Sequence, residues 1–271
     1  MRNDLWQKGL TVVFLILCIQ LICYTVPPVA TLQGSSKQAG LIGLWHMNFD
    51  EDPIRDDSGN NQTGALLSAG NPDYVTGKFG GAYDFDAVGD KITIANDAAL
   101  SFGNKVNDFP FTFTAWINMD DATEFRILSK GGYGTNNWEY LFFSDVSDHL
   151  KIHIFDQSVP AAIPDRMSGN TLTAYQNMWI FVAVTYDGRG GATATTGITL
   201  YVNGVATTGD TVNNDASYVA MENDLVNDVQ IGAGDETACD GTIDEVAVFN
   251  RALSAGEIFK MYHENAKVLI E

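Results

Sequence analysis

The chemistry that this sequence suggests first is cation binding by carboxylates near residue 50. Five acidic residues fall within eight positions: Asp50, Glu51, Asp52, Asp56 and Asp57. Like charges at this density repel one another unless a cation balances them, and Ca²⁺ takes six to eight oxygen ligands from carboxylates and carbonyls. The spacing is not that of an EF-hand loop, because the closing glutamate is missing. The sequence therefore predicts either a calcium site or a solvated acidic loop.

Other groups of residues indicate less chemistry. His149 and His153 share one face of an expected strand, but no cysteine or cluster of carboxylates stands beside them, so zinc binding is not expected. The glycine-rich segment 188–191 does not stand between a strand and a helix, as a phosphate loop requires, and we expect a turn there. Cys239 is the only cysteine after residue 23, which excludes an internal disulfide in the domain and predicts a buried free thiol.

The charge of the chain excludes one class of partner. The 271 residues carry a formal net charge of −19, which repels phosphates and argues against nucleic-acid binding. The same charge fits a soluble extracellular surface.

The first thirty residues have the pattern of a secretory signal. Arg2 and Lys8 precede an apolar run of 17 residues, Leu10 to Val26, which a pair of prolines ends. That length is the lower limit for crossing a bilayer, so an uncleaved N-terminal membrane anchor is the alternative. We predict a signal or anchor over residues 1–30, a small polar linker over 31–40 and one domain over 41–271, secreted or held at the cell surface.

From Leu41 onward, short alternating runs separated by Gly, Asn and Asp predict an all-β sandwich of antiparallel sheets. The expected strands cover residues 44–49, 91–94, 111–118, 140–143, 150–155, 179–186, 198–202, 229–231 and 242–249. The run Ile180–Val184 is apolar at both parities, which predicts a strand buried on both faces. The residues expected on the inner face of the neighbouring strand are Phe111, Phe113, Trp116 and Ile117.

Two local signals mark the ends of elements. Asn203-Gly204 between strand-like runs predicts a hairpin. Ser254 with Glu257 three residues later forms a capping box, which predicts one short C-terminal helix.

The order of the motifs carries a family resemblance. The segments that carry it are Leu44–Glu51, Asp57–Asn60, Gly77–Phe85, Phe111–Ile117, Trp179–Gly188, Leu200–Gly204, Ile243–Val246 and Arg251–Ser254. This succession resembles the laminin-G-like jelly-roll domains of the concanavalin A-like lectin/glucanase superfamily, and it covers about residues 41–263. The fold hosts lectins, adhesion modules and glycosidases alike, so the resemblance indicates architecture more than activity.

The resemblance implies two curved antiparallel sheets packed face to face, with the first and last strands adjacent. In members of this superfamily a structural calcium often lies where those strands meet. The resemblance therefore implies that Asp244 on the closing strand is one ligand, and that Asp50 or Asp57 from the opening segment is another. In the alternative, Asp244 accepts backbone hydrogen bonds.

A glycosidase needs two carboxylates about 5–9.5 Å apart. Glucanases of this superfamily carry them closely spaced on one strand of the concave face. The corresponding runs here, 138–143 and 150–155, contain only Glu139. Asp244 and Glu245 are adjacent, so on a regular strand their side chains point to opposite faces. We expect no catalytic residue and no enzyme.

In this architecture, loops at the sheet edge carry binding. Sugar recognition uses an aromatic ring with planar amides beside it, and the loop that ends at residue 138 supplies both. The predicted ligand-binding residues are Tyr133, Asn137 and Trp138, with ordinary loop residues as the alternative.

Taken together, these features predict a non-catalytic binding or adhesion module, stabilised by calcium, at the cell exterior. Glycan is the first choice of ligand and extracellular protein the second, and the membrane is contacted only through an uncleaved N-terminal segment. A structural subunit of a surface layer or filament is one alternative, with self-association through Cys239 or edge strands. An unusual or degenerate glycosidase is the other.

Overall fold

The computed structural model describes residues 38–66, 71–86, 89–131, 138–158, 162–223, 226–234 and 237–264. These residues belong to a compact unit, Ser36–Glu271. The predicted signal or anchor over 1–30 and most of the predicted linker lie outside the described residues. Within the described part of the chain, no helix is long and apolar enough to span a membrane.

The described chain is built around two antiparallel sheets. Sheet A contains, in spatial order, β13 (Val205–Ala206), β12 (Ile198–Val202), β11 (Ile180–Tyr186), β6 (Phe111–Asp121), β18 (Asp240–Phe249), β4 (Gly81–Asp86) and β3 (Asp73–Thr76), and β1 (Leu41–Trp45) also pairs with β18. Sheet B contains, in order, β14 (Thr211–Asn213), β10 (Asp165–Thr171), β9 (His149–Ile154), β8 (Tyr140–Ser144), β7 (Arg126–Lys130), β15 (Val229–Ile231), β5 (Ile92–Ile94) and β2 (Gly64–Leu66).

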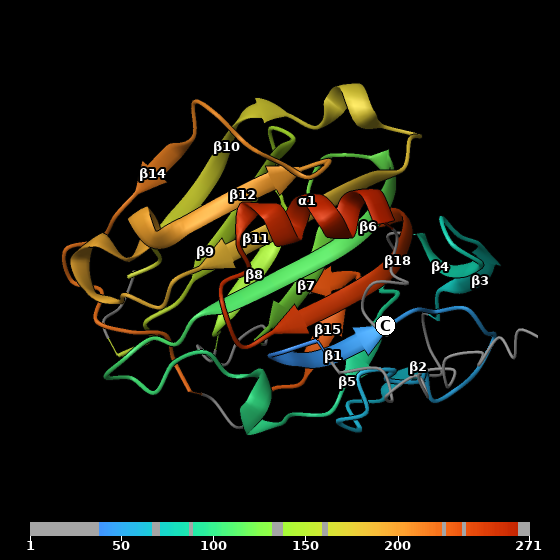
Figure 1. Cartoon of the computed structure of the whole chain (residues 1–271), viewed down its shortest axis with the longest axis horizontal. Helices are drawn as coiled ribbons and strands as arrows, with labels where there is room; N and C mark the ends of the chain where they lie inside the picture. Colours follow the sequence, from blue (N-terminus) through green and yellow to red (C-terminus); the bar gives the residue numbers. More distant parts are fainter. Residues whose placement is uncertain are drawn as a thin grey trace, which may run out of the picture. The chain divides into compact units, whose positions relative to one another are not determined.

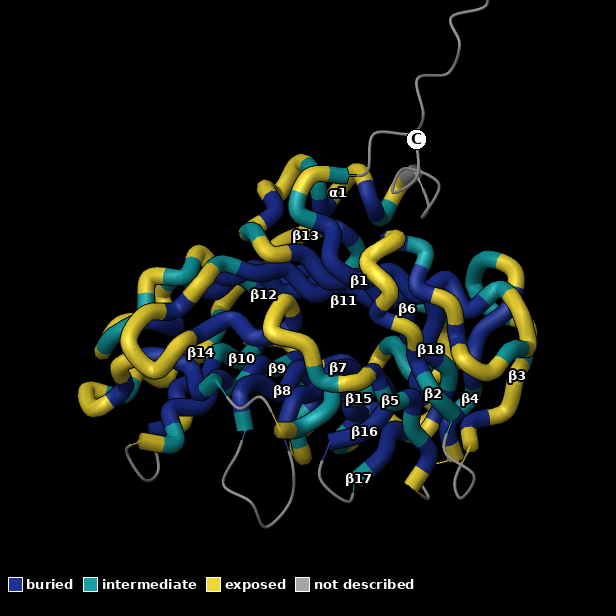
Figure 2. The backbone as a smooth tube through the Cα atoms, turned by 90° about the horizontal axis from the view of Figure 1, so that it is seen from below, coloured by how far each residue is buried: buried dark blue, intermediate teal, exposed yellow. Residues whose placement is uncertain are grey.

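The two sheets form two layers, which Figure 2 shows edge on, with largely buried backbone in both. Short elements complete the unit: the hairpin β16 (Ala233–Gly234) and β17 (Thr237–Ala238), the 3₁₀ helices η1 (Ala98–Leu100), η2 (Thr173–Tyr175) and η3 (Gly191–Gly197), and the helix α1 (Ala255–Glu264). The expected all-β jelly-roll sandwich with one short C-terminal helix is therefore confirmed.

The first and last strands of the domain are neighbours, as the resemblance implies. β1 pairs antiparallel with β18, with Trp45 opposite Val246, and Figure 1 shows the two strands side by side. β18 also pairs with β6, and its register shifts between Asp244 and Ala247. Glu245 stands at this bulge with a φ of 54°, so the strand is irregular where its two acids lie.

The space between the sheets is filled by aromatic and branched side chains. Phe111, Phe113 and Ile117 of β6 belong to this core, as predicted. Trp116 does not, and its prediction as an inner-face residue was wrong. It lies on the outer face of sheet A, in a second cluster with Phe181. The strand β6 is buried on both of its faces, so an apolar side chain is covered whichever face of the sheet it points to.

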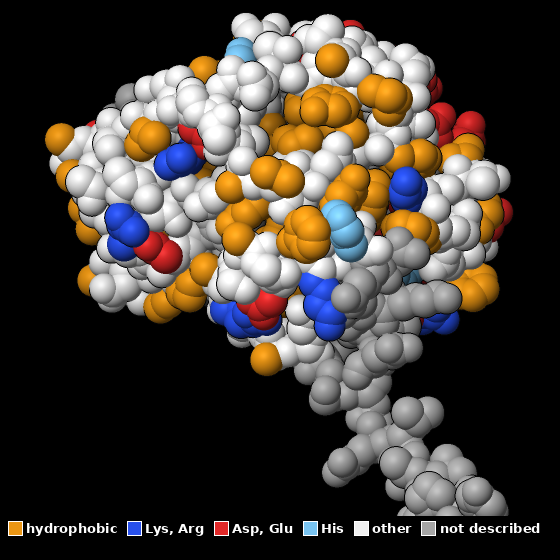
Figure 3. Space-filling model, turned by 45° about the horizontal axis from the view of Figure 1, so that its top comes forward, with side chains coloured by type: hydrophobic (Ala, Val, Ile, Leu, Met, Phe, Trp, Pro, Cys, Tyr) orange, Lys and Arg blue, Asp and Glu red, His pale blue; other side chains and the backbone are white. Residues whose placement is uncertain are grey.

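The cover on the outer face of sheet A is α1. Its residues Ile258 and Met261 are buried in the same cluster as Trp116. The predicted capping box is confirmed: the backbone N–H of Ser254 donates to Glu257 Oε2 at 2.8 Å, and the Glu257 N–H donates to Ser254 Oγ at 3.3 Å. Figure 3 shows hydrophobic side chains still gathered on the face turned forward there. The exposed ones include Phe259 of α1.

Two further local predictions are confirmed, and several strands were not among those predicted: β2, β3, β4, β7, β10 and β14. β11 is buried throughout, and Asn203 and Gly204 join β12 to β13 with positive φ values of 50° and 76°. Strand β10 was not predicted, because its run Arg-Met-Ser-Gly-Asn-Thr has no alternation of apolar residues. The first strand runs from Leu41 to Trp45 rather than over residues 44–49.

Candidate functional site

An aromatic cluster lies on the outer face of sheet B, separate from the core between the sheets. β8 and β9 alternate, so Leu141, Phe143 and His153 turn away from the core while their neighbours turn in. Phe155 and the partly buried Trp138 pack with Leu141 and Phe143. We call Trp138, Leu141, Phe143, His153 and Phe155 the outer aromatic cluster.

The rings of the outer aromatic cluster contact one another in a chain. The centroids of Trp138 and Phe155 are 5.6 Å apart with their planes 32° from parallel. His153 stands edge-on to Phe155 at 5.8 Å and to Phe143 at 5.0 Å. Phe143 and Phe155 are buried, so Trp138 and His153 are the rings of this cluster that stay partly exposed.

Two cations lie near this cluster, and each is paired with a carboxylate: Arg126 with Glu124 at 3.2 Å and Lys151 with Asp165 at 3.4 Å. The guanidinium of Arg126 lies 4.7 Å from the centroid of the Phe143 ring, a cation–π distance. Burial, together with the charges of Lys151 and Arg126, lowers the pKa of His153 to about 3. His153 is therefore an uncharged aromatic ring at physiological pH. The arrangement can stack an apolar ring face, but His153 cannot supply a proton there.

Gly131 at the end of β7 makes room for the indole of Trp138. A Cβ built on Gly131 would lie 2.4 Å from Trp138 Cδ2, far inside van der Waals contact. The indole thus rests on bare backbone, which fixes the ring without a side chain beside it. Of the three predicted ligand-binding residues, Trp138 is placed on this surface. Tyr133 and Asn137 lie outside the described residues.

The three predicted calcium ligands are not assembled into one group. Asp50 is exposed, and Asp57 Oδ1 accepts an ion pair from Arg55 Nε at 2.7 Å. Asp244 is fully buried, and its Oδ2 accepts a hydrogen bond from the backbone N–H of Phe79 at 3.0 Å. In the described parts of the chain, no three His, Cys, Asp or Glu side chains are grouped to hold a metal ion. Among the described residues, Asp50, Asp57 and Asp244 therefore do not form one preassembled carboxylate cage.

Asp244 behaves instead as a buried hydrogen-bond acceptor with a strongly shifted pKa. Burial raises the pKa of its carboxyl to about 8, against the opposing effect of the Phe79 N–H, and the nearby charge of Glu245 raises it as well. Its Oδ1 is buried and has no hydrogen-bond partner among the described residues. The contact fixes the turn at residues 77–80, whose Phe79 ring stands edge-on to Trp116 at 5.6 Å.

Glu245 has a different partner from its neighbour. Its Oε2 lies 2.6 Å from His46 Nδ1 in a buried ion pair. Burial alone would lower the pKa of His46, but the hydrogen bond and charge of Glu245 outweigh that effect and raise it. Asp57 and Asp244 add to the rise. The adjacent acids Asp244 and Glu245 thus serve separate structural contacts, and they are not a pair facing a groove.

Glu139, the acid in the mid-chain strands, is also buried. Glu139 and Lys130 are both 0% exposed, with Glu139 Oε1 3.0 Å from Lys130 Nζ. Ser101 Oγ lies 2.5 Å from the same ammonium nitrogen. A charge pair closed off from solvent in this way does not face a substrate. Sequence reasoning missed this pair, although oppositely charged residues at the ends of neighbouring strands are a usable signal.

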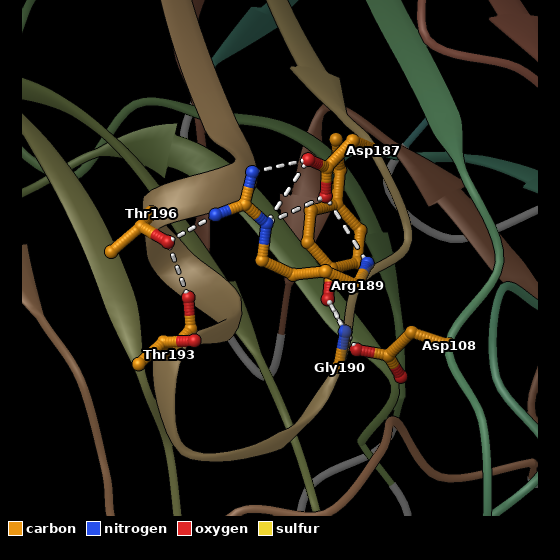
Figure 4. Close-up of polar contacts among 7 residues, drawn as sticks. Asp108, Asp187, Arg189, Gly190, Thr193 and Thr196 are labelled. Atoms are coloured by element: carbon orange, nitrogen blue, oxygen red, sulfur yellow. Dashed lines mark hydrogen bonds and ion pairs between the residues drawn. The ribbon is translucent and has the colours of Figure 1, made fainter.

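The glycine-rich turn after β11 is a surface turn, as predicted. Arg189 is held by both carboxylate oxygens of Asp187, and its Nη1 donates to Thr196 Oγ1 at 2.6 Å (Figure 4). The N–H of Gly190 donates to the hydroxyl of Tyr186, which itself donates to Asp108 Oδ2 at 2.6 Å. The cation of Arg189 is therefore engaged locally.

Cys239 is a free thiol, fully buried in the core. This confirms the prediction of a buried thiol. In the described fold, Cys239 is not accessible for joining two chains, which removes one route to the structural-subunit alternative.

Comparison with known proteins agrees with this architecture. The family profile described as Concanavalin A-like lectin/glucanases superfamily, of the laminin-G type, matches residues 86–259, more than half of the chain. A search of curated proteins gave no match.

Solved structures show the same fold at low sequence identity. The binding domain of Paraclostridial Mosquitocidal Protein 1 is similar with a TM-score of 0.55 and 16% identity, over 83% of this chain and 52% of that one. Domain 4 of an extracellular GH43 arabinanase from Geobacillus stearothermophilus, solved with arabinotriose, gives 0.54 and 14%, over 83% and 99%. A Trypanosoma rangeli sialidase with 2,3-difluorosialic acid gives 0.54 and 15%, over 84% and 34%.

This chain thus spans about half of the mosquitocidal binding domain, a third of the sialidase and nearly all of the arabinanase domain. At these identities the likeness establishes fold alone. With the profile match and the paired sheets, the chain belongs to the concanavalin A-like lectin/glucanase superfamily as a laminin-G-like domain.

Proposed function

We propose that this protein is a non-catalytic glycan-binding module that works at the cell exterior through the outer face of sheet B. The observation that carries the proposal is the partly exposed indole of Trp138, which lies on Gly131 and against Phe155. A sugar ring presents a face of C–H groups that stacks on an aromatic ring, while its hydroxyls take hydrogen bonds from neighbouring donors.

The composition of this face supports binding without hydrolysis. Hydrolysis of a glycoside needs two carboxylates on either side of the scissile bond. β8 and β9 contain no acidic residue, and Asp165 on β10 is held by Lys151 Nζ at 3.4 Å and Asn213 Nδ2 at 3.0 Å. Glu139 is buried with Lys130. The described part of this face therefore offers a stacking surface rather than an acid–base pair.

The comparisons support the same ligand class and location. One similar domain was solved with arabinotriose and belongs to an enzyme described as extracellular, and another is a toxin's binding domain. The predicted signal or anchor at residues 1–30 agrees with an exterior location.

The proposal is tested by binding measurements on a glycan array and by calorimetry with the best glycan. Trp138→Ala is expected to weaken binding at least tenfold, because the stacking ring is removed. Gly131→Ala is expected to weaken it too, because the new Cβ displaces the indole. Phe259→Ala is the matched control, an exposed aromatic on α1, and is expected to bind as the wild type does.

Unchanged glycan binding by Trp138→Ala with an intact fold would contradict this site. Concentration-dependent assembly in sedimentation experiments, with no glycan bound by the wild type, would favour the structural-subunit alternative instead. Turnover of a polysaccharide, abolished by Glu139→Gln, would favour the glycosidase.

The calcium prediction stays a prediction, and it has a direct test. Binding through Asp244 requires that calcium raises the melting temperature of the wild type relative to EDTA, and that Asp244→Asn removes the rise. Equal melting in calcium and in EDTA, together with no heat of binding in calorimetry, would contradict it.

A further inference from the structure

A groove lies at the open edge of the sandwich, away from the outer aromatic cluster. It has a volume of about 260 Å³ and is formed where the end of β10 and η2 from one side meet β12 and β13 from the other. In Figure 1 these strands lie at the same edge of the unit. Its size is just below the range of about 300–1,000 Å³ that drug-sized ligands occupy, so it fits a single sugar ring.

The groove has one apolar side and one polar side. Tyr175 and Val202 are partly buried and pack against the core between the sheets, and Val205 beside them is 64% exposed. Asn170, Thr171 and Thr208 form the polar side, and their side chains make no hydrogen bond to another described residue. A pyranose or furanose ring divides in the same way, into a face of C–H groups and an edge of hydroxyls.

The polar side is fixed in place before any ligand arrives. Asp210 Oδ2 accepts from Arg166 Nε at 3.0 Å and from Thr207 Oγ1 at 2.8 Å, and Asp210 Oδ1 accepts from the Gly169 N–H at 3.3 Å. These contacts tie β10 to the turn that follows β13. A Cβ on Gly169 would lie 2.3 Å from the carbonyl oxygen of Thr208, so the two segments are in close contact. A site held in this way loses little entropy on binding.

The lining of the groove carries no charged side chain, in a chain whose net charge is −19. An anionic sugar would find no cation there and would meet an unfavourable overall field. A neutral sugar needs only hydroxyl and amide partners, which Asn170, Thr171 and Thr208 supply.

We infer that this groove is a second saccharide subsite, which takes one neutral sugar unit with its C–H face on Tyr175. The inference shares its ligand class with the proposed function, but it rests on different elements of the fold. Two such sites on one domain would bind separate units of a polysaccharide, or separate chains, and raise the avidity.

The test is saturation-transfer NMR and titration with methyl galactopyranoside, methyl glucopyranoside and methyl arabinofuranoside, with glucuronic acid as the anionic probe. At least one neutral probe is expected to bind both to the wild type and to Trp138→Ala, because the groove is intact in that variant. Tyr175→Ala in the Trp138→Ala background is expected to weaken that binding at least tenfold, and Thr208→Val at least threefold. Tyr175→Phe keeps the ring and is expected to bind normally. Melting temperatures confirm that each variant is folded.

The outcomes separate this inference from the proposed function. Loss of all neutral-sugar binding in Trp138→Ala alone would overturn the groove and leave the outer face of sheet B standing. Loss in Tyr175→Ala alone, with Trp138→Ala unaffected, would support the groove and contradict the outer face. Tighter binding of glucuronic acid than of the neutral probes to the Trp138→Ala variant would overturn the inference, as would no binding of any probe to the wild type.

Discussion

The two outer faces of the sandwich both carry aromatic residues, but among the described residues only those of sheet A are covered by a helix of the chain. On sheet A, Trp116 is enclosed by Phe181, Phe79 and Tyr262, each with a ring centroid 5.6 Å away. Lys78 Nζ lies 4.5 Å from the centre of the Trp116 ring. On sheet B, Trp138 has one aromatic neighbour within the described residues, Phe155, and stays partly exposed.

The difference shows how to separate packing from recognition. An aromatic residue that a helix or turn of its own chain covers contributes its apolar area to stability. An aromatic residue that stays partly exposed beside a strand, while its other face packs on the chain, has apolar area left for a partner. The comparison makes stability the expected readout for sheet A and binding the expected readout for sheet B.

The largest effect is expected from Trp116→Ala. Removing this ring leaves a cavity under α1 and next to Phe79, which costs about 3–5 kcal/mol of unfolding free energy. Urea denaturation measures the loss, and calorimetry on the folded protein measures glycan binding, which is expected to be unchanged. A loss below about 1 kcal/mol would show that sheet A's outer face is not closed in the way described.

The variant Asp244→Asn tests the contact with the turn next to Trp116 through the pH dependence of the unfolding free energy. The pKa of Asp244 in the folded protein is about 8, above the ordinary value of 3.8. The carboxyl is therefore protonated in the fold over most of the pH range between these two values. Its contribution to stability is complete below about pH 4 and is lost as the pH rises towards 8. Asparagine cannot ionise but keeps an oxygen for the Phe79 N–H.

Between pH 5 and pH 8, the wild type is therefore expected to lose at least about 1 kcal/mol of unfolding free energy relative to Asp244→Asn. Denaturation curves at a series of pH values check this. Asp244→Ala, which removes the acceptor as well, is expected to be less stable than Asp244→Asn at every pH. Parallel pH profiles for the wild type and Asp244→Asn would contradict the raised pKa.

The smallest effect is expected on the outward side of α1. Phe259 is 48% exposed and stacks on His263 with centroids 4.0 Å apart, so Phe259→Ser is expected to change the unfolding free energy by less than about 0.5 kcal/mol. Ile258→Ser, on the buried side of the same helix, is the contrast and is expected to cost more than about 2 kcal/mol. Similar losses from both variants would mean that the helix does not close this face.

Periodicity and turn chemistry predicted the fold well because they are local. The alternation in β9, the Asn203-Gly204 turn and the Ser254–Glu257 capping box each act within a few residues. The face of Trp116 was missed because β6 is covered on both sides, and its outer cover comes from a helix about 140 residues away. No local pattern carries that information.

The candidate site was predictable only in part. Trp138 was identified by residue type, but its seat on Gly131 and its contact with Phe155 depend on how three segments meet. The Lys130–Glu139 pair depends on the register of β7 and β8. The sequence likewise does not show that Asp57 pairs with Arg55 or that Asp244 accepts the Phe79 N–H, because both contacts depend on the folded geometry.

The buried thiol of Cys239 can report on local opening of the domain. It is the sole cysteine among the described residues, and its backbone N–H is bonded to Gly232 O at 2.8 Å, beside the closing strand. An alkylating reagent reaches that sulfur only when the sandwich opens there. The labelling rate at increasing reagent concentration therefore measures the rate at which the closing strand opens. A ligand that binds to either face should slow the labelling of Cys239, whatever the ligand is.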